Sequence, residues 1–183
     1  METLYIEENI KYDGWQLAPH WIYQNYQLLG DAIVAFTGEV NVPVDHMVDL
    51  ADVMDQAHIY SPLMLNFIIE HFNHDLNLAI MRQRLFMVCI KEELEQFEIP
   101  VTRRGDDLYI AKNKLSVSIA TTSLVSTLIH VGLNIETQGT PVPAAGLKEL
   151  GVKDIPSFAE NCMMRYKREL EQIYDARCKV RAR

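Results

Sequence analysis

One stretch of the sequence, KLSVSIATTSLVSTLIHVGLNI at residues 114–135, combines strand character with side chains that can do chemistry. Lys114 opens it, and His130, Gly132 and Asn134 close it at alternating positions. Two runs rich in β-branched and apolar residues around a short polar connection are typical of a β-hairpin. An ammonium, an imidazole and a carboxamide on one sheet face could bind a polar ligand and stabilise a developing negative charge.

Side chains alternate between the two faces of a strand, so the polar residues of each half of the hairpin share one face. With the turn centred near Leu124, the two polar faces coincide on one side. The small residues at its middle leave room for a ligand or for a packed helix, because a strand glycine often marks such a close approach. The predicted cross-strand pairs are Lys114 with Asn134, Ser116 with Gly132, and Ser118 with His130.

Arg82 is a further candidate for contact with an anion. On a helical wheel its side chain falls inside the apolar stripe of a predicted helix at residues 76–97. A guanidinium in such a place must find a carboxylate or a phosphate, since an unpaired buried charge is costly. We therefore expect Arg82 either to pair with Glu93, which falls near the same helix face, or to contact an anionic ligand from below the sheet.

No metal site is predicted. His71 and His74 lie three residues apart beside Asp75, a spacing that can ligate a metal, but no third ligand stands at a recognised distance. The three cysteines are widely spaced and match no zinc or redox pattern.

Composition and charge limit the partners that the chain can have. The 183 residues are 49% apolar and 23% charged, with a net charge of −8. This length fits one ordinary domain, so we expect residues 1–183 to form a single domain. The negative field repels phosphate backbones and anionic lipids, which disfavours nucleic acid and membrane surfaces as partners.

The location of the protein can be predicted from its N-terminus and its cysteines. The N-terminal METLYIEEN is acidic and lacks the apolar region of a secretory signal, and no apolar run approaches the roughly 18 residues that cross a bilayer. Unpaired, widely spaced cysteines suit a reducing compartment. We expect a cytoplasmic protein.

The order of the predicted elements indicates an α+β fold with a mostly antiparallel sheet flanked by helices. Ser61-Pro62 is typical of a helix start, because serine can cap a helix and proline suits its first position. Outside the hairpin, hydrophobic periodicity predicts strands at residues 4–7 and 33–36 and a helix at 157–173. It also predicts helices at 61–72 and 76–97, or one bent helix across both segments.

The hairpin resembles the core motif of the lipoate and biotin protein ligase and octanoyltransferase superfamily. The matching segments are Lys114-Leu-Ser-Val-Ser-Ile and His130-Val-Gly-Leu-Asn134, and the likeness covers roughly residues 45 to 147. Over the whole chain, His20-Trp21, Met47-Val-Asp-Leu50 and Ala176-Arg-Cys-Lys-Val180 resemble the family called domain of unknown function 366, which is similar to the class II aminoacyl-tRNA synthetase and biotin synthetase fold.

This resemblance implies roles for the hairpin residues. Lys114 would contact the acyl carbonyl and phosphate of an acyl-adenylate, or the carbonyl of a thioester, and Asn134 would orient a phosphate or a metal-bound water. ATP and Mg²⁺ are therefore implied as cosubstrates. In the same pocket His130, Ser116 and Ser118 would line the walls, and Gly132 would admit the ligand.

Two departures from the superfamily pattern keep other functions open. Octanoyltransferases carry a Pro-Cys-Gly acyl acceptor where this chain has Pro143-Ala144-Ala145-Gly146, and the Arg-Gly-Gly substrate loop is absent. We expect an acyl or adenylate-type transferase or ligase acting on a small molecule. The alternatives are a non-catalytic binder of a nucleotide-like ligand, a protein-interaction module, or a homodimer whose sheet face packs on its partner.

Overall fold

A five-stranded sheet with the order β1-β2-β3-β8-β7 forms the centre of the computed structural model, which describes residues 1–57 and 59–182. Only β1 and β2 are parallel, and each of the other neighbouring pairs is antiparallel. The predicted α+β fold with a mostly antiparallel sheet is confirmed. The strands are β1 (Glu2–Ile6), β2 (Ala32–Val42), β3 (Ile59–His71), β7 (Ser116–Thr122) and β8 (Thr127–Glu136).

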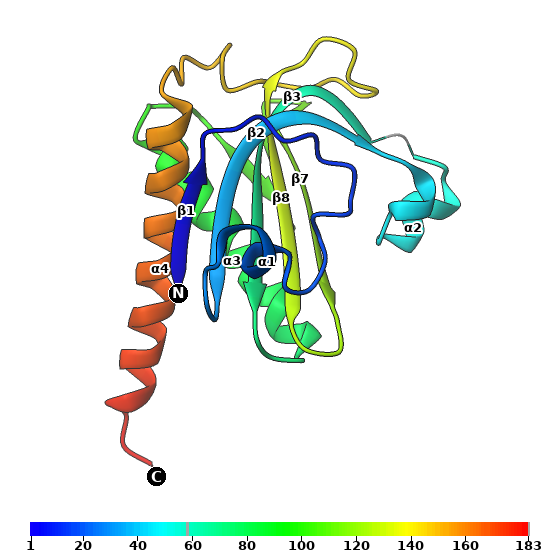
Figure 1. The fold of residues 1–183 in the computed structure, drawn as a ribbon. Helices are drawn as coiled ribbons and strands as arrows, with labels where there is room; N and C mark the ends of the chain where they lie inside the picture. The colour runs from blue at the N-terminus through cyan, green and yellow to red at the C-terminus, as the bar shows by residue number, and fades with distance from the viewer. Residues whose placement is uncertain (58, 183) are drawn as a thin grey trace.

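Two long helices, α3 (Leu76–Glu95) and α4 (Ile155–Cys178), cover one face of this sheet (Figure 1). Aromatic rings fill the core between these helices and the sheet, with Phe86 of α3 edge-on to Phe67 of β3 at 5.0 Å between ring centroids. α4 begins two residues earlier than predicted, because the carboxylate of Asp154 caps it. Among the described residues, no helix is both long enough and apolar enough to cross a membrane.

The opposite face carries the N-terminal segment and the short helix α1 (Trp21–Tyr26) over a smaller apolar core (Figure 1). Residues 10–12 lie directly on β2, with the Ile10 N–H donating to Thr37 O at 2.9 Å. The backbones can approach because Gly38 has no side chain, and a Cβ at this position would collide with the carbonyl group of Ile10. The absence of a side chain at Gly38 therefore fixes where this segment crosses the sheet.

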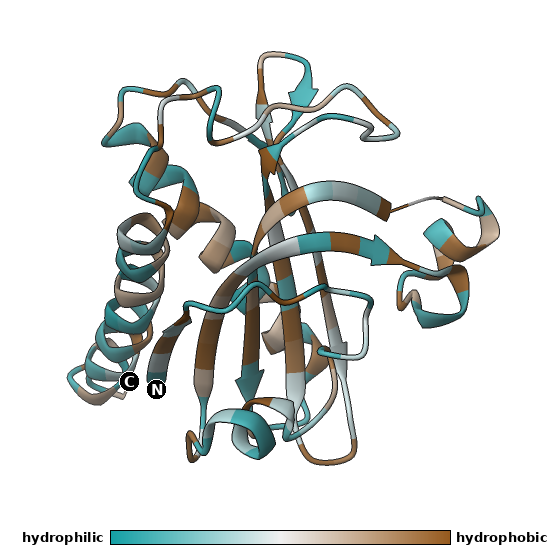
Figure 2. Ribbon diagram, turned by 45° about the horizontal axis from the view of Figure 1, so that its top comes forward, coloured by the Kyte–Doolittle hydropathy of each residue, from teal (hydrophilic) through white to brown (hydrophobic). Residues whose placement is uncertain are grey.

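Two smaller units extend from the main sheet. The ends of β2 and β3 curve away from it as a long arm that carries the 3-10 helix η1 (Val44–His46) and the helix α2 (Leu50–Met54) (Figure 2). A second sheet, with strand order β4-β5-β6, lies between α3 and β7 in the chain. Its strands are β4 (Thr102–Arg104), β5 (Asp107–Ile110) and β6 (Asn113–Lys114).

The helix predicted from Ser61 to Phe72 is wrong, because this segment is the central strand β3. Residues 64–71 are buried on both faces between β2 and β8. Their sequence is therefore a continuous apolar run and lacks the alternation of apolar and polar residues that identifies a strand. Pro62 is tolerated because it lies at the register shift between β3 and β2 and before the first residue of β3 that pairs with β8.

The hairpin of β7 and β8 exists as predicted, but its register differs by one residue. Val117 lies opposite Gly132, and Ile119 lies opposite His130. A shift of one residue exchanges the two faces of a strand, so Val117 and Ile119 share the face of His130 while Ser116 and Ser118 face α3. The predicted pairs of Ser116 with Gly132 and Ser118 with His130 are therefore wrong.

Replacement of Gly38 by alanine tests the close crossing of the N-terminal segment. We expect Gly38→Ala to lower the free energy of unfolding by several kcal/mol, because the new methyl group would collide with the backbone of Ile10. This backbone cannot shift without moving the rest of the N-terminal segment. Gly132→Ala is the matched control, since its Cβ would meet the flexible end of Met64 at 3.0 Å. Chemical denaturation measures both variants, and equal losses would contradict this account of Gly38.

Candidate functional site

A cleft of about 440 Å³ lies on the face of the sheet that carries the N-terminal segment. β3, β7 and β8 supply its floor through residues that include Met64, Val117 and His130. The N-terminal segment, the curved arm, the small sheet and the loop at residues 140–144 surround it. The cleft is therefore bordered by segments from most of the chain.

Lys114 and Asn134 meet at one end of this cleft. The Asn134 side-chain amide donates to the Lys114 carbonyl at 3.3 Å, and both residues line the cavity. Lys114 itself pairs with Tyr109 of β5 and forms an isolated β-bridge with Ala144. The chain pairs with β8 only from Ser116 onward, where β7 begins. The predicted proximity of lysine and asparagine is thus present, although Lys114 belongs to the small sheet and not to β7.

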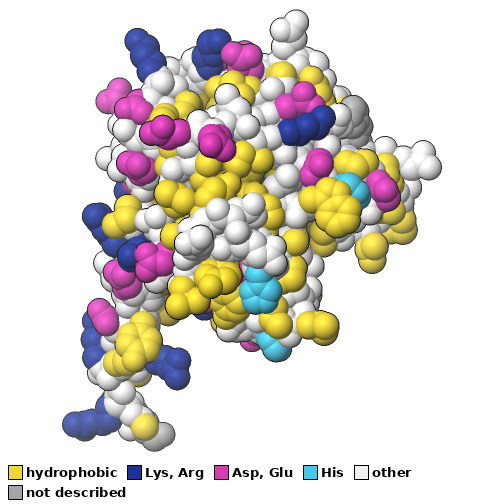
Figure 3. Space-filling view, in the orientation of Figure 1, with side chains coloured by type: hydrophobic (Ala, Val, Ile, Leu, Met, Phe, Trp, Pro, Cys, Tyr) yellow, Lys and Arg dark blue, Asp and Glu magenta, His cyan; other side chains and the backbone are white. Residues whose placement is uncertain are grey.

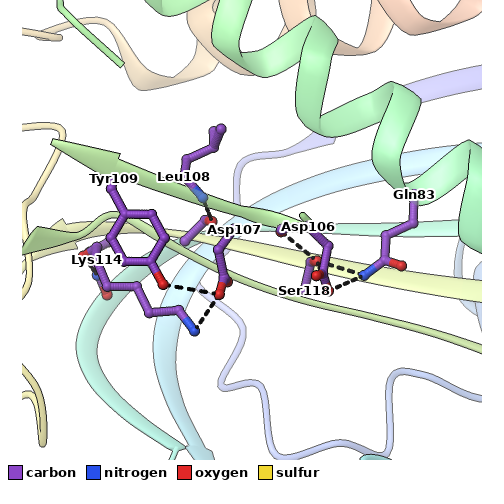
Figure 4. A network of polar contacts seen from close by, with 9 residues as sticks. Gln83, Asp106, Asp107, Leu108, Tyr109, Lys114 and Ser118 are labelled. Atoms are coloured by element: carbon purple, nitrogen blue, oxygen red, sulfur yellow. Dashed lines mark hydrogen bonds and ion pairs between the residues drawn. The ribbon is translucent and has the colours of Figure 1, made fainter. Parts of the chain in front are cut away.

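The Lys114 ammonium is held in place by neighbours on the same small sheet (Figure 4). Its Nζ lies 3.0 Å from Oδ2 of Asp107, and the Tyr109 hydroxyl donates to the same oxygen at 3.3 Å. About a third of the Lys114 side chain is exposed. A positive charge with a restrained position therefore faces the cleft.

Ser116 and Ser118 border the cleft, but their hydroxyl groups are used within the protein. Ser116 Oγ accepts the Leu108 N–H at 2.8 Å. Ser118 Oγ donates to the Asp106 carbonyl at 2.9 Å and accepts from the Gln83 amide at 2.6 Å (Figure 4). These contacts tie the small sheet and α3 to β7, so the two serines support the wall of the cleft.

The other end of the cleft is neutral. His130 is 4% exposed, its Nε2 lies 3.0 Å from Oδ1 of Asn66, and its ring stacks on Tyr12 with 3.8 Å between centroids. Burial lowers the pKa of His130 to about 3, so the imidazole is uncharged at neutral pH. Burial also raises the pKa of the Tyr12 hydroxyl well above its usual value.

Gly132 lies between these two ends, and protein atoms occupy the space beside it. A Cβ there would lie 3.0 Å from Met64 Sδ and 3.2 Å from a methyl group of Val117. The missing side chain therefore makes room for Met64, and the middle of the cleft floor is apolar. Gly132 admits a packing partner from β3 and presents no open space of its own.

Carboxylates surround the Lys114 end of the cleft, and the arm supplies two of them from the start of α2. Asp49, Asp52, Asp106 and Asp107 all line the cleft. Burial raises the pKa of Asp52, the charge of Asp49 raises it further, and Lys114 partly opposes them. Tyr12 and Asp52 could not be identified from the sequence, since neither stands near the hairpin in the chain. Asp106 and Asp107 form a carboxylate pair that could serve acid-base chemistry, but beside Gly105 the pair is first of all a turn signal.

Arg82 lies apart from this cleft. It borders a separate hollow of about 290 Å³ between α3 and α4, together with Asp31, Lys167 and Tyr174. Its Nη1 is buried and makes no hydrogen bond to any described residue. Glu93 pairs with Arg165 at 2.6 Å, so the expected Arg82–Glu93 ion pair is wrong.

The His71 region also belongs to the fold and not to the cleft. Its Nδ1 lies 2.7 Å from Asp31 Oδ2, and its Nε2 lies 3.0 Å from the Tyr166 hydroxyl, so both ring nitrogens are used. Burial lowers the pKa of His71, although its hydrogen bond to Asp31 opposes that shift. Within the described ranges, no group of three or more His, Cys, Asp or Glu side chains is arranged to hold a metal.

Comparisons with known proteins show both a family and a fold. The sequence model of the family described as "Domain of unknown function (DUF366)" matches residues 1–181. A solved structure of a protein of unknown function from Pyrococcus horikoshi is 42% identical, with a TM-score of 0.94 over 100% of this chain and 98% of that one.

More distant structures share the fold at low identity. A T. acidophilum protein provisionally described as a lipoate protein ligase is 12% identical, with a TM-score of 0.64 over 93% of this chain and 85% of that one. The biotin protein ligase from Aquifex aeolicus in complex with biotin and ATP is 16% identical, with a TM-score of 0.59 over 93% and 71% of the two chains. The fold is that of the lipoate and biotin ligase cores.

The buried neutral state of His130 predicts a pH dependence of stability. Its pKa is about 3 in the folded chain and near 6.5 when unfolded, so the unfolded chain binds the extra proton between these values. Stability should therefore fall as the pH drops from about 6.5 toward 3, by up to about 1.4 kcal/mol per pH unit from this residue. His130→Phe should reduce the slope by that amount in denaturation at a series of pH values, and an unchanged slope would refute the assignment.

A substitution at Arg82 tests whether its buried nitrogen has a partner within the protein. We expect Arg82→Met to change the free energy of unfolding by less than about 0.5 kcal/mol or to raise it, because it removes a buried nitrogen that has no partner. Arg165→Met is the control, and should cost about 1–3 kcal/mol because it leaves the buried Glu93 carboxylate unpaired. Thermal and chemical denaturation measure both variants, and a loss for Arg82→Met as large as that of the control would contradict the description.

Proposed function

The chain belongs to the DUF366 family, and we propose that its cleft binds a small activated acyl compound and transfers the acyl group with the help of Lys114. The observation that carries this proposal is the position of Lys114 and Asn134 at one end of the cleft, where the Asn134 carboxamide donates to the Lys114 main-chain carbonyl. The ligase-type fold supports it, since Aquifex aeolicus biotin protein ligase of this fold has been solved with biotin and ATP.

The position of Lys114 suits the stabilisation of a developing negative charge. The ion pair with Asp107 restrains the ammonium before any ligand arrives, so little reorganisation is needed during the reaction. Partial burial of the pair strengthens its electrostatic effect relative to bulk water. Such an ammonium would hold the carbonyl oxygen of an acyl group.

The proposed step proceeds through a tetrahedral intermediate. An acceptor amine or water attacks the carbonyl carbon, and the electron pair of the C=O double bond moves to the oxygen beside Lys114. The pair then re-forms the carbonyl and expels the leaving group, which is a thiolate or a nucleotide phosphate. Asp52, whose pKa is raised by burial and by Asp49, accepts the proton that the nucleophile loses.

The residues of the cleft do not fit a protein-held Mg²⁺ site, which bears on the ATP implied by the fold. Four aspartates surround one lysine, and within the described chain no three metal-binding side chains converge. A polyphosphate would meet net negative charge there. The proposed transfer therefore depends on Lys114, Asn134 and Asp52, with an activated acyl donor and no step that uses a protein-held metal.

A second candidate function is ligand binding without catalysis. Lys114 is already neutralised by Asp107, and residues 143–146 offer no acceptor thiol. A cleft with this arrangement could retain a ligand whose carboxylate replaces the Asp107 contact. The two functions differ in what the loss of Lys114 does to turnover.

A hydroxylamine trap tests acyl transfer directly. With octanoyl-coenzyme A as donor, the wild-type chain should accelerate hydroxamate formation above the uncatalysed rate. Lys114→Met should lower kcat by about 100-fold or more, the range seen when a group that stabilises an oxyanion is removed. Its stability should change by no more than about 1 kcal/mol, because a partly exposed ion pair contributes little.

Lys112→Met is the matched control, since Lys112 is exposed on the same turn and does not line the cleft. It should retain wild-type turnover. An equal rate for Lys114→Met and wild type would exclude the proposed role of the ammonium. Donor binding without turnover in the wild type would favour the non-catalytic candidate.

A further inference from the structure

We propose that the hollow between α3 and α4 is a second binding site, in which Arg82 holds the carboxylate of a small molecule with an apolar body. The hollow lies on the side of the sheet that these two helices cover, and none of the residues that line it lines the cleft. The proposed site is therefore independent of the acyl transfer proposed for the cleft.

Arg82 carries a charge that the protein leaves without a bonded partner. Its side chain is half-buried, and its Nη1 is buried and makes no hydrogen bond to any described residue. Glu93 pairs with Arg165, and Asp31 pairs with His71. A guanidinium that is partly removed from water without such a partner is costly, so its position indicates an acceptor that the described chain does not supply.

The end of the Arg82 side chain can turn toward the hollow. No hydrogen bond to a described residue holds the guanidinium in place, and the side chain borders the cavity. A rotation about its outer bonds would bring the buried nitrogen to the cavity wall. Two parallel N–H groups of a guanidinium match the two oxygens of a carboxylate, which makes this the strongest simple pairing that the group can form.

Asp31 lines the same hollow, but each of its oxygens is already used. His71 Nδ1 lies 2.7 Å from Oδ2, and the Phe72 N–H donates to Oδ1 at 2.8 Å. Burial raises the pKa of Asp31, but these hydrogen bonds and the charge of Arg82 bring it below its usual value, so Asp31 is ionised at neutral pH. A ligand at Arg82 would therefore not have to displace an internal ion pair.

The charges around the hollow favour an anion of single charge. Lys167 of α4 is half-buried, lines the hollow and forms no ion pair with a described residue, so it adds a second cation. Three carboxylates also line the hollow, and two of them, Glu171 and Asp175, are exposed at its rim, whereas the third is Asp31. Because these carboxylates repel a dianion such as phosphate more strongly than a monoanion, a monocarboxylate suits the site better.

The size and walls of the hollow define the rest of the ligand. Its volume of about 290 Å³ lies at the lower end of the range of roughly 300–1,000 Å³ that is typical of small-molecule pockets. Met1, Leu170 and Tyr174 add apolar surface to the walls. A short, branched hydrocarbon chain attached to the carboxylate therefore matches the cavity.

An acid and its amide test the proposal, because they have the same shape and differ in charge. Isothermal titration calorimetry on the whole chain would compare isocaproate with isocaproamide and with inorganic phosphate. Isocaproate should bind about tenfold or more tighter than isocaproamide, since only the acid forms charge-assisted hydrogen bonds with Arg82. Phosphate should bind more weakly than isocaproate.

Three substitutions locate the bound acid. Arg82→Met should weaken isocaproate by about tenfold or more without lowering the free energy of unfolding. Lys167→Met should weaken it by about twofold to fivefold, as expected for a partly exposed ion pair. Arg168→Met is the matched control, since Arg168 is an exposed cation of α4 that does not line the hollow, and it should leave the affinity unchanged.

Lys114→Met separates this site from the cleft. It should leave the affinity for isocaproate unchanged, because Lys114 lines only the cleft. A loss with Lys114→Met in place of Arg82→Met would assign the acid to the cleft and overturn the proposal. Equal affinities for isocaproate and isocaproamide, or no saturable binding of isocaproate, would also overturn it, because Arg82 would then be partnered by water alone.

Discussion

The contact of the Ile10 backbone with Gly38 is the constraint on which the cleft depends. The N-terminal segment can lie on β2 only because no side chain stands at this position. Hydrogen bonds on both sides of Tyr12, to Glu39 O at 2.8 Å and from Asn41 N–H at 3.0 Å, then align the segment with the strand. Tyr12 is thereby placed over His130, and the inner wall of the cleft forms from residues more than a hundred positions apart.

The cleft joins two regions of different electrostatic character. At the Lys114 end an ammonium pairs with Asp107 and lies among three further aspartates, partly exposed to solvent. At the Tyr12 end both titratable side chains are neutral because burial disfavours their ionised forms. Apolar and acidic side chains gather on the face of the arm seen in Figure 3, where α2 adds to the charged end.

The sequence predicted those parts of the fold whose patterns are local. Helix α3 and the β7–β8 hairpin have clear periodicity, and the Lys114 and Asn134 motif pointed to the cleft. β3 was read as a helix because a strand buried on both faces has no alternation. The predicted hairpin register was one residue off because the turn at residues 123–126 is centred between Leu124 and Val125 and not at Leu124.

The remaining site residues depend on tertiary contacts that no local pattern encodes. Tyr12 and Asp52 reach the cleft through the Gly38 crossing and the curved arm, respectively. Arg82 has the right chemistry for an anion, yet the face of α3 on which it lies is turned toward α4 and away from the cleft. Residue type alone therefore did not predict the location of Arg82.

The central claim is that the Lys114 ammonium contacts the acyl group of a ligand bound in the cleft. The most direct measurement is an NMR titration of the whole chain, with isotope-labelled lysine, by octanoyl-coenzyme A. The account predicts that the side-chain nitrogen of Lys114 shifts as the donor binds, whereas that of the exposed Lys112 does not. An unchanged Lys114 signal, or equal shifts at both lysines, would contradict it.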